Sequence, residues 1–313
     1  MNTIPLGISA CVVGQAVRYN AGQAKMPSLL KKIQDDFDFR AFCPEMAAGM
    51  GVPREPVRLV NQAGENRLLG TDSKKDWSQA IVEASQEQLN YLQGQQLRGY
   101  IVKSKSPSCA HGSAKQYSEK AMVEEKVDGI FTAMLVRQLP IAVVESEQLN
   151  SPLVADRFLQ RVMLADDFYH LPDELQGRHL IDLYARYKLL IMAYSPAHYQ
   201  QAGQLLANLA GRDLQQVKHQ LYLILFDALD RYSSKPRQIN ALMHIQGYFK
   251  QYLSKPLKSE LSRLLERYRD AEVPLSVPIT MIQHYLLLYP DQYLASQKYL
   301  LPYSDSYGLR NYL

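Results

Sequence analysis

The sequence predicts an α/β N-terminal domain followed by an all-α C-terminal domain, and two observations lead to this fold class. Up to about residue 150, short β-branched and apolar runs alternate with helical stretches, whereas beyond it helical periodicity prevails. The chain has 313 residues, of which 47% are hydrophobic and 21% charged, so it has the composition of a globular protein and the length of two domains. Disordered, collagen-like and fibrous architectures are therefore excluded.

Strands and helices are expected to alternate along the N-terminal half. The expected strands are 5–10, 40–43, 57–60, 100–103 and 140–144, and the expected helices are 28–36, 74–93 and 119–137, the last broken at Gly129. Strand–helix–strand alternation is typical of parallel pairing with crossover helices. The sequence therefore predicts a Rossmann-like, mostly parallel sheet with helices on both faces.

The C-terminal half is expected to be helical because proline, which favours the first turn of a helix, stands at suitable starts. These prolines are Pro196, Pro236, Pro256 and Pro278. Between the halves, the polar segment 145–152 ends in Ser-Pro and suits a short linker. We therefore place the domain boundary near residue 150, with one domain over residues 1–148 and the other over residues 149–313.

Charge and hydropathy exclude some classes of protein. The net charge of +4, from 35 basic and 31 acidic residues, is too small to identify a nucleic-acid binder. Apolar runs such as 189–193 and 285–289 fall far short of the ~20 residues of a membrane helix, so no membrane association is expected. Residues 1–10 lack the pattern of a secretory signal, and the expected location is the cytoplasm, where cysteines stay reduced.

The three cysteines fall where predicted strands end. Cys11 follows the first strand, Cys43 ends the second, and Cys109 lies in the loop after strand 100–103. Because the carboxyl ends of parallel strands meet at one crevice, we expect the thiols to converge although 32 and 66 residues separate them. Each stands beside glycine, proline or serine, whereas an inert cysteine usually packs among apolar residues.

Three converging thiolates could bind zinc or an iron–sulfur cluster. Structural zinc usually takes a fourth protein ligand, for which His111 is a candidate. A 4Fe-4S cluster on three cysteines would leave one iron open to act as a Lewis acid. The spacing of the cysteines does not choose between these metals.

Polar residues near the cysteines could serve chemistry at such a centre. Glu45 could act as a general base or proton shuttle, and Ser106 could hydrogen-bond a substrate or relay a proton, although either could instead cap a turn. The sequence holds no GxGxxG or P-loop motif, so a nucleotide cofactor has no support. The candidate donors to a polar or anionic ligand are Arg18, Asn20, Lys103, Ser104 and Lys105.

Tyrosines are concentrated in the C-terminal half. There, 17 of the 21 tyrosines occur together with 18 basic and 15 acidic residues, and tyrosine and basic residues are neighbours in segments 184–188, 231–232, 248–252 and 267–269. Cations beside aromatic rings suit phosphate contact and base stacking, with Arg186 and Lys188 the preferred candidates for RNA contact. The alternative is that these tyrosines fill a helical core.

Several segments resemble known families. Residues 9–20 (SACVVGQAVRYN), 43–45 (CPE) and 105–109 (KSPSC) resemble the thiouracil desulfurase family, over roughly residues 5–145. Residues 179–188, 240–249 and 299–311 look like the helical YbgA-type domain. The fusion of these two domains resembles the bacterial tRNA 4-thiouridine desulfidases.

The resemblance implies a 4Fe-4S cluster on Cys11, Cys43 and Cys109 with one open iron, and catalytic roles for Glu45 and Ser106. It further implies that the helical domain presents tRNA containing 4-thiouridine, and no DNA partner is expected. A soft thiocarbonyl sulfur polarised by iron and attacked by water would give uridine and hydrogen sulfide without net electron transfer. The alternatives are a desulfurase of free thiopyrimidine bases or nucleosides and a non-catalytic iron–sulfur sensor or RNA-binding module.

Overall fold

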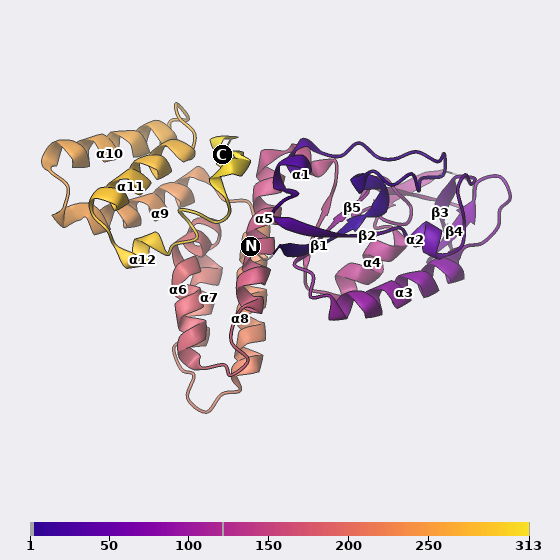
Figure 1. Ribbon diagram of the computed structural model, residues 1–313, viewed down its shortest axis with the longest axis horizontal. Helices are drawn as coiled ribbons and strands as arrows, with labels where there is room; N and C mark the ends of the chain where they lie inside the picture. The colour runs from indigo at the N-terminus through magenta and orange to yellow at the C-terminus, as the bar shows by residue number, and fades with distance from the viewer. Residues whose placement is uncertain (1–2, 121, 313) are drawn as a thin grey trace. The chain divides into compact units, whose positions relative to one another are not determined.

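The computed structural model describes residues 3–120 and 122–312. The chain divides into two compact units, Met1–Val154 and Ala155–Leu313. The first unit is α/β and the second is helical, which confirms the predicted fold class (Figure 1). Within the described ranges, no helix combines the length and the apolar character needed to cross a membrane.

A four-stranded parallel sheet forms the centre of the N-terminal unit. Its strand order is β2-β1-β5-β8. The strands are β1 (Ile4–Ser9), β2 (Phe37–Phe42), β5 (Gly99–Val102) and β8 (Ala142–Glu145), and they correspond to four of the five predicted strands. In this register Leu6 of β1 lies opposite Phe39 on one side and Gly99 on the other, so β1 is a central strand.

The fifth predicted strand belongs to a separate sheet, so the prediction of one sheet was wrong. This second sheet has the order β4-β3-β6-β7, with β3 (Val57–Gln62), β4 (Glu65–Gly70), β6 (Ala114–Tyr117) and β7 (Val123–Val127). Only the β3–β6 pair is parallel. Strands β4 and β6 were not predicted because half of the residues of each carry charged or amide side chains, which weakens the apolar pattern that identifies a strand.

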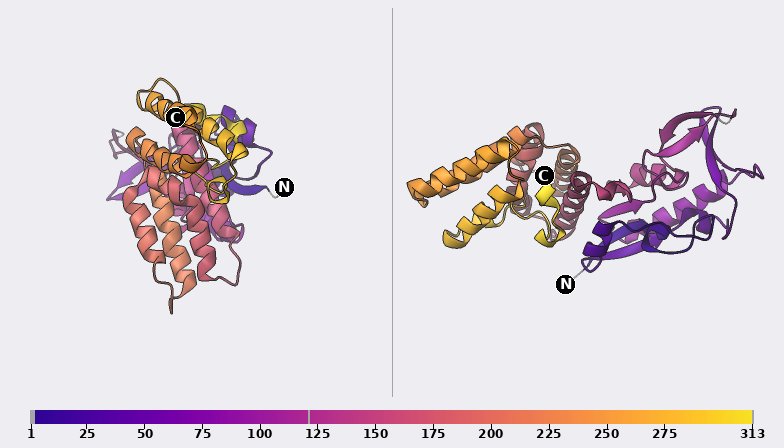
Figure 2. Two further views of the ribbon diagram at one scale, coloured as in Figure 1. Left: turned by 90° about the vertical axis from the view of Figure 1, so that its left-hand side faces the viewer. Right: turned by 90° about the horizontal axis from the view of Figure 1, so that it is seen from above.

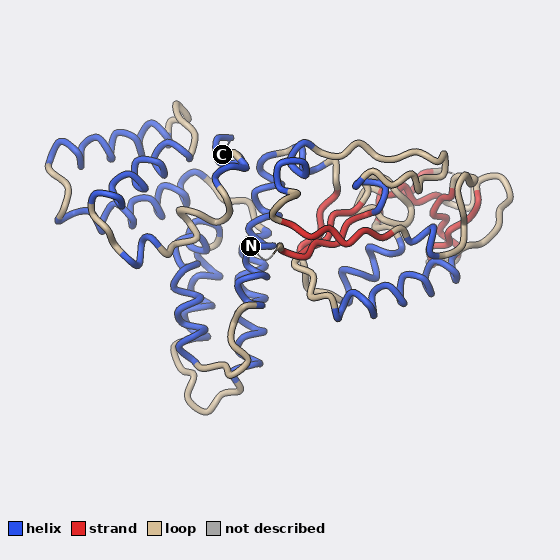
Figure 3. Tube along the Cα trace, viewed as in Figure 1, coloured by secondary structure: helices blue, strands red, loops and turns tan. Residues whose placement is uncertain are grey.

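Helices lie on both sides of the N-terminal strands. They are α1 (Ser28–Ile33), α2 (Pro44–Ala47), α3 (Ser78–Gly94) and α4 (Ile130–Gln138), with 3-10 turns η1 (Ala10–Val13) and η2 (Gln148–Asn150). Helices α3 and α4 lie together on one side of the strands and α1 on the other (Figures 1 and 3). The predicted helix 119–137 was wrong over residues 123–127, because Val123 and Val127 at the ends of β7 pair with β6. Residue 121 of the predicted helix lies outside the described residues.

The C-terminal unit is a set of helices grouped around α6. The elements are α5 (Pro152–Tyr169), α6 (Gly177–Tyr194), α7 (Pro196–Leu206), α8 (Leu214–Asp230), α9 (Lys235–Tyr248), η3 (Phe249–Gln251), α10 (Lys255–Arg269), α11 (Ser276–Leu288), α12 (Gln292–Ala295), η4 (Asp305–Tyr307) and η5 (Leu309–Tyr312). Helix α6 contacts α7, α8 and α9, whereas α9, α10 and α11 gather at one end of the unit (Figures 1 and 2). Helices α7, α9 and α10 begin with proline in the first turn, as predicted.

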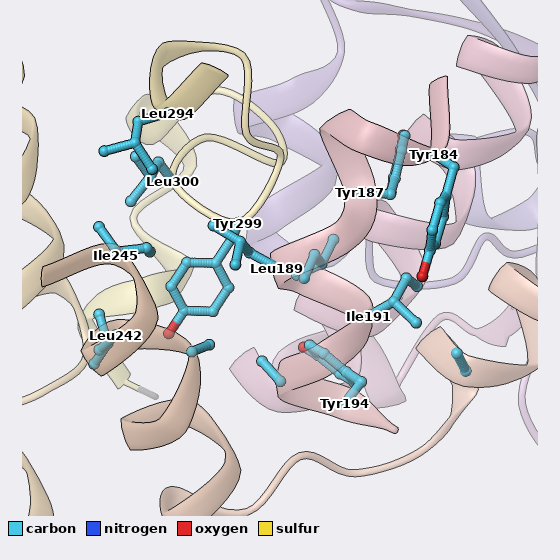
Figure 4. Close-up of a cluster of buried hydrophobic side chains, with 14 of the residues drawn as sticks. Tyr184, Tyr187, Leu189, Ile191, Tyr194, Leu242, Ile245, Leu294, Tyr299 and Leu300 are labelled. Atoms are coloured by element: carbon cyan, nitrogen blue, oxygen red, sulfur yellow. The ribbon is translucent and has the colours of Figure 1, made fainter. Parts of the chain in front are cut away.

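Many of the C-terminal tyrosines are core residues. Tyr187, Tyr194 and Tyr299 are buried among leucine and isoleucine side chains of α6, α9 and the segment after α12 (Figure 4). Tyr184 and Tyr268, which the sequence suggested for RNA contact, are also buried. Core packing therefore accounts for part of the tyrosine pattern, whereas Tyr232, Tyr248 and Tyr252 are exposed.

Candidate functional site

Three neighbouring strands bring the cysteines together. Strands β2, β1 and β5 are adjacent and parallel, so their carboxyl ends lie side by side. Cys43 follows β2 directly, Cys11 lies in the 3-10 turn after β1, and Cys109 lies in the loop after β5. All three line one cavity of about 430 Å³ in the N-terminal unit. The cavity therefore occupies the position where parallel α/β sheets bind ligands.

Backbone and hydroxyl groups surround the thiols. The N–H groups of Met46 and Glu45 donate toward the Cys43 sulfur. The Ser9 hydroxyl hydrogen-bonds the Cys109 thiol and also accepts from the backbone N–H of Lys103 at 3.0 Å. Such donors stabilise a thiolate relative to a thiol and therefore act to lower the thiol pKa.

Burial opposes this effect in all three cysteines. It raises the pKa of Cys11 to about 11, with a further contribution from the neighbouring Cys43 sulfur. Burial also raises the pKa of Cys43, and it raises the pKa of Cys109 well above the usual value of a thiol. The thiolate set therefore needs a compensating cation, which a bound metal would provide.

The donor set consists of three thiols, and soft sulfur ligands of this kind suit an iron–sulfur cluster. In the described part of the chain, no three His, Cys, Asp or Glu side chains are grouped closely enough to hold a single metal ion. Three separate thiols around one cavity could hold the corners of an iron–sulfur cluster, whose iron atoms take cysteine sulfur. His111 does not line this cavity, and its ring lies 3.0 Å from a carboxylate oxygen of Asp128. It is thus not placed as a fourth ligand with the thiols.

Glu45 lies in the cavity wall and is held by two neighbours. Its Oε2 accepts from Arg54 Nε at 3.0 Å and from Arg54 Nη2, and its Oε1 accepts from the Ser108 hydroxyl at 2.8 Å. The side chains of Arg54 and Glu45 are only 7% and 13% exposed. A carboxylate has about four lone-pair sites, so three donors leave one site for a water molecule or a ligand. This arrangement fixes a carboxylate anion beside the thiols.

Ser106 lies in the cavity wall, and its hydroxyl hydrogen can still be donated to a ligand. Its Oγ accepts from the backbone N–H groups of Ser108 and Cys109 at 3.3 and 3.2 Å. In both contacts the hydroxyl is the acceptor, so its O–H can donate to a ligand. The same contacts stabilise the turn, so both the capping role and the functional role considered from the sequence are compatible with its position.

The predicted polar ligand donors differ in position. Arg18, Lys103, Ser104 and Lys105 line the cavity with the thiols, whereas Asn20 does not and instead accepts from the backbone N–H of Gly22. Arg186 and Lys188 belong to α6 of the other unit.

Sequence reasoning missed several residues at the site, among them Arg54 and Glu147. Arg54 orients Glu45 and also donates to the backbone carbonyls of Gly51 and Val17, at 2.8 and 3.0 Å. Glu147 lines the cavity and pairs with Lys103 at 3.0 Å. The sequence signal that could have identified Arg54 is its position between Pro53 and Pro56, nine residues after Glu45. The two prolines restrict the backbone and make this segment short and rigid.

Gly129 supports the Cys109 loop from behind. A Cβ added at Gly129 would lie 2.4 Å from the backbone carbon of Ser108 and 2.5 Å from the backbone nitrogen of Cys109. Gly129 also donates its N–H to the carbonyl of Ala110 at 2.8 Å. Only glycine therefore allows the start of α4 to approach the loop this closely.

Replacing Gly129 with alanine should lower the free energy of unfolding of the N-terminal unit by about 1–3 kcal/mol, because backbone must move to admit the methyl group. The only tryptophan, Trp77, lies in this unit, so its fluorescence during urea unfolding can monitor the change. The matched control is Gly94→Ala in α3, where a Cβ meets no atom within 4 Å and stability should be equal or higher. Equal stability of the two variants would contradict this account of Gly129.

Comparison with known proteins places the chain in a family. Residues 6–147 match the family model of 2-thiouracil desulfurase, and residues 188–304 match a family described as protein of unknown function (DUF1722). Over 153 residues the chain is 32% identical to the uncharacterized protein YbgA of Escherichia coli K12, a match that covers 48% of this chain and 90% of YbgA. The chain belongs to the YbgA family. It combines a 2-thiouracil desulfurase domain with a YbgA-like helical domain.

Two further proteins are similar to part of this YbgA-family chain. The uncharacterized protein YbbK of Bacillus subtilis 168 is 29% identical over 151 residues, which are 47% of this chain and 98% of YbbK. A solved structure of the [4Fe-4S]-dependent thiouracil desulfidase TudS is 29% identical, with a TM-score of 0.40, and the match covers 48% of this chain and 93% of that chain.

Proposed function

We propose that this protein is an iron–sulfur-dependent desulfidase that converts 4-thiouridine in tRNA to uridine and releases hydrogen sulfide. The observation that supports it is the convergence of three cysteines and Glu45 on one cavity of a 2-thiouracil desulfurase domain. The all-sulfur donor set suits an iron–sulfur cluster on Cys11, Cys43 and Cys109. The YbgA-like helical unit would hold the RNA.

The reaction exchanges sulfur for oxygen and needs no electron donor. Water oxygen bonds to the ring carbon, the C–S bond breaks, and sulfur leaves with two protons as hydrogen sulfide. A bound cluster with three thiolate ligands would supply an iron that polarises the soft thiocarbonyl sulfur. In this proposal Glu45 takes a proton from the attacking water and the O–H of Ser106 donates to the bound pyrimidine, which is supported by the position of both side chains in the cavity wall.

The test is turnover by protein purified without oxygen. Iron and sulfide are measured per chain, and the protein is incubated with tRNA containing 4-thiouridine while the thiocarbonyl absorbance is followed. Loss of absorbance with release of hydrogen sulfide is the expected result. A protein that carries zinc in place of iron, or that stays fully active in air, would contradict the proposal.

Free thiopyrimidines are the second candidate substrate, because the family of the N-terminal unit is described by its action on 2-thiouracil. An enzyme that acts on tRNA needs a surface that binds RNA, which the helical unit would provide, whereas an enzyme that acts on free bases does not. Comparison of kcat/KM for free 4-thiouridine, 2-thiouracil and thiolated tRNA separates the two. Much faster turnover of the free compounds would favour the second candidate.

Of the two expected RNA contacts, we choose Lys188 for the test of RNA binding. Arg186 pairs with Asp167 at 3.4 Å, whereas the Lys188 Nζ lies 5.8 Å from the ring centroid of Tyr199. Replacing Lys188 with glutamate should weaken tRNA binding roughly tenfold at low salt and reduce the salt slope of log K by about one, because one phosphate contact is lost. Lys218→Glu on α8 makes the same change of charge and serves as the control. Equal weakening in both variants would indicate a general charge effect and contradict a contact at Lys188.

A further inference from the structure

Four tyrosines of the helical unit form two stacked pairs that the proposed chemistry does not use. Tyr248 stacks on Tyr293 with ring centroids 5.4 Å apart, and Tyr252 stacks on Tyr289 with centroids 5.9 Å apart. The planes within each pair differ by only 22° and 24°. Tyr248 and Tyr252 come from the end of α9 and the turn after η3, and their partners flank Asp291 beyond α11. These four residues are here named the tyrosine strip.

The inner rings of the strip support the outer rings. Tyr289 and Tyr293 pack partly against the hydrophobic core, whereas Tyr248 and Tyr252 are 44% and 57% exposed. Each outer ring therefore rests on a fixed partner and leaves aromatic surface open to solvent. Tyr187 of the core, by contrast, leaves almost no ring surface open to solvent. Because the rings are already held, binding to them would cost little conformational entropy.

Positive charge accompanies the strip. Exposed Lys250 lies in η3 between the two outer tyrosines. Tyr199 neighbours Tyr293 of the strip: together with burial and Tyr248, it raises the pKa of Tyr293 to about 12. Lys188 in turn lies over the Tyr199 ring, which brings a second lysine near the strip. Asp291, the nearest acid in sequence, accepts from the backbone N–H of Leu294 and caps α12. Aromatic surface beside lysines suits stacked bases with phosphates on either side.

We infer that the tyrosine strip binds unpaired nucleotides of RNA, with bases stacked on Tyr248 and Tyr252 and phosphates close to Lys250 and Lys188. The inference rests on the proposed function and names the part of the RNA that the helical unit would hold, a loop or single strand. Bases inside a duplex are already stacked on their neighbours, so their faces are closed to a protein ring. Stacking tolerates any base, which suits recognition of shape more than of sequence.

The experiment measures RNA binding by the full-length chain, with RNA that contains no thiouridine. Fluorescence anisotropy compares a labelled hairpin with an unpaired loop and a fully paired duplex of equal length. The double variant Tyr248→Ala/Tyr252→Ala should bind the loop roughly 10- to 100-fold more weakly, with an unchanged salt slope because no phosphate contact is lost. Phenylalanine at both positions should restore binding, since the aromatic rings are retained.

Tyr312→Ala removes a tyrosine that is 73% exposed and lies outside the strip, so it is the matched control. Unchanged loop binding in the double alanine variant, or an equal loss for loop and duplex, would overturn the inference. A shift in self-association of that variant with unchanged loop binding would assign the strip to a second copy of the chain instead. None of these measurements involves desulfuration, so turnover of free 4-thiouridine tests the proposed chemistry independently.

Discussion

Replacing Cys11 with alanine should reduce the iron and sulfide content of the anaerobically prepared protein to background and abolish desulfuration of 4-thiouridine. In the proposed site, only two of the three thiolates would remain to hold the cluster. Burial raises the pKa of both remaining thiols, so they would ionise less readily without the charge of a metal beside them. Iron and sulfide analysis and the absorption of the cluster measure the loss. The same result is expected for Cys43→Ala.

Loss of iron must be separated from loss of folding. Cys109 packs in a core cluster with Tyr100 and Phe131, so its replacement also disturbs packing, whereas Cys43 is only partly buried. Urea unfolding followed by Trp77 fluorescence, with each variant prepared without metal, compares the stability of the folded chains directly. A Cys11→Ala or Cys43→Ala variant that retains full iron content would contradict ligation by that cysteine.

The fold was predicted where sequence periodicity directly reflects burial. The strands of the parallel sheet are fully or partly buried and have apolar runs, so β1, β5 and β8 were recognisable. The second sheet was not predicted because its outer strands expose charged side chains and are held by pairing with β3 and β6. Residues 123–127 look helical in the sequence but form β7, because their pairing with β6 is a tertiary interaction that the local pattern does not contain.

The cavity could be predicted in part because strand ends follow from strand order. Parallel β2, β1 and β5 are adjacent, so residues that directly follow them share one edge. The position of Arg54 could not be predicted, because its contact with Glu45 depends on the path of a loop between α2 and β3. Asn20 was misplaced for the same reason: its side chain closes a local turn with Gly22 instead of facing the cavity.

Replacing Glu45 with glutamine should lower kcat for 4-thiouridine by roughly 10²–10⁴ while leaving iron and sulfide content unchanged. Glutamine retains the shape of the side chain but cannot accept a proton from the attacking water, so the loss expected is that of a general base. Iron analysis and single-turnover kinetics on the same preparation measure the two effects. If the chain were a non-catalytic iron–sulfur sensor, the wild type itself would show no turnover.

A variant of a residue that contacts Glu45 can serve as the control, because it changes the orientation of the Glu45 carboxylate without removing its charge. Without the carboxylate, Arg54 would be a nearly buried cation with no anionic partner, so Glu45→Gln should also lower the free energy of unfolding. Ser108→Ala removes one hydrogen bond to the same carboxylate but keeps its charge, so kcat should fall by at most about tenfold. An equal loss in the two variants would mean that orientation, and not proton transfer, limits the reaction, whereas an unchanged kcat in Glu45→Gln would exclude Glu45 as the base.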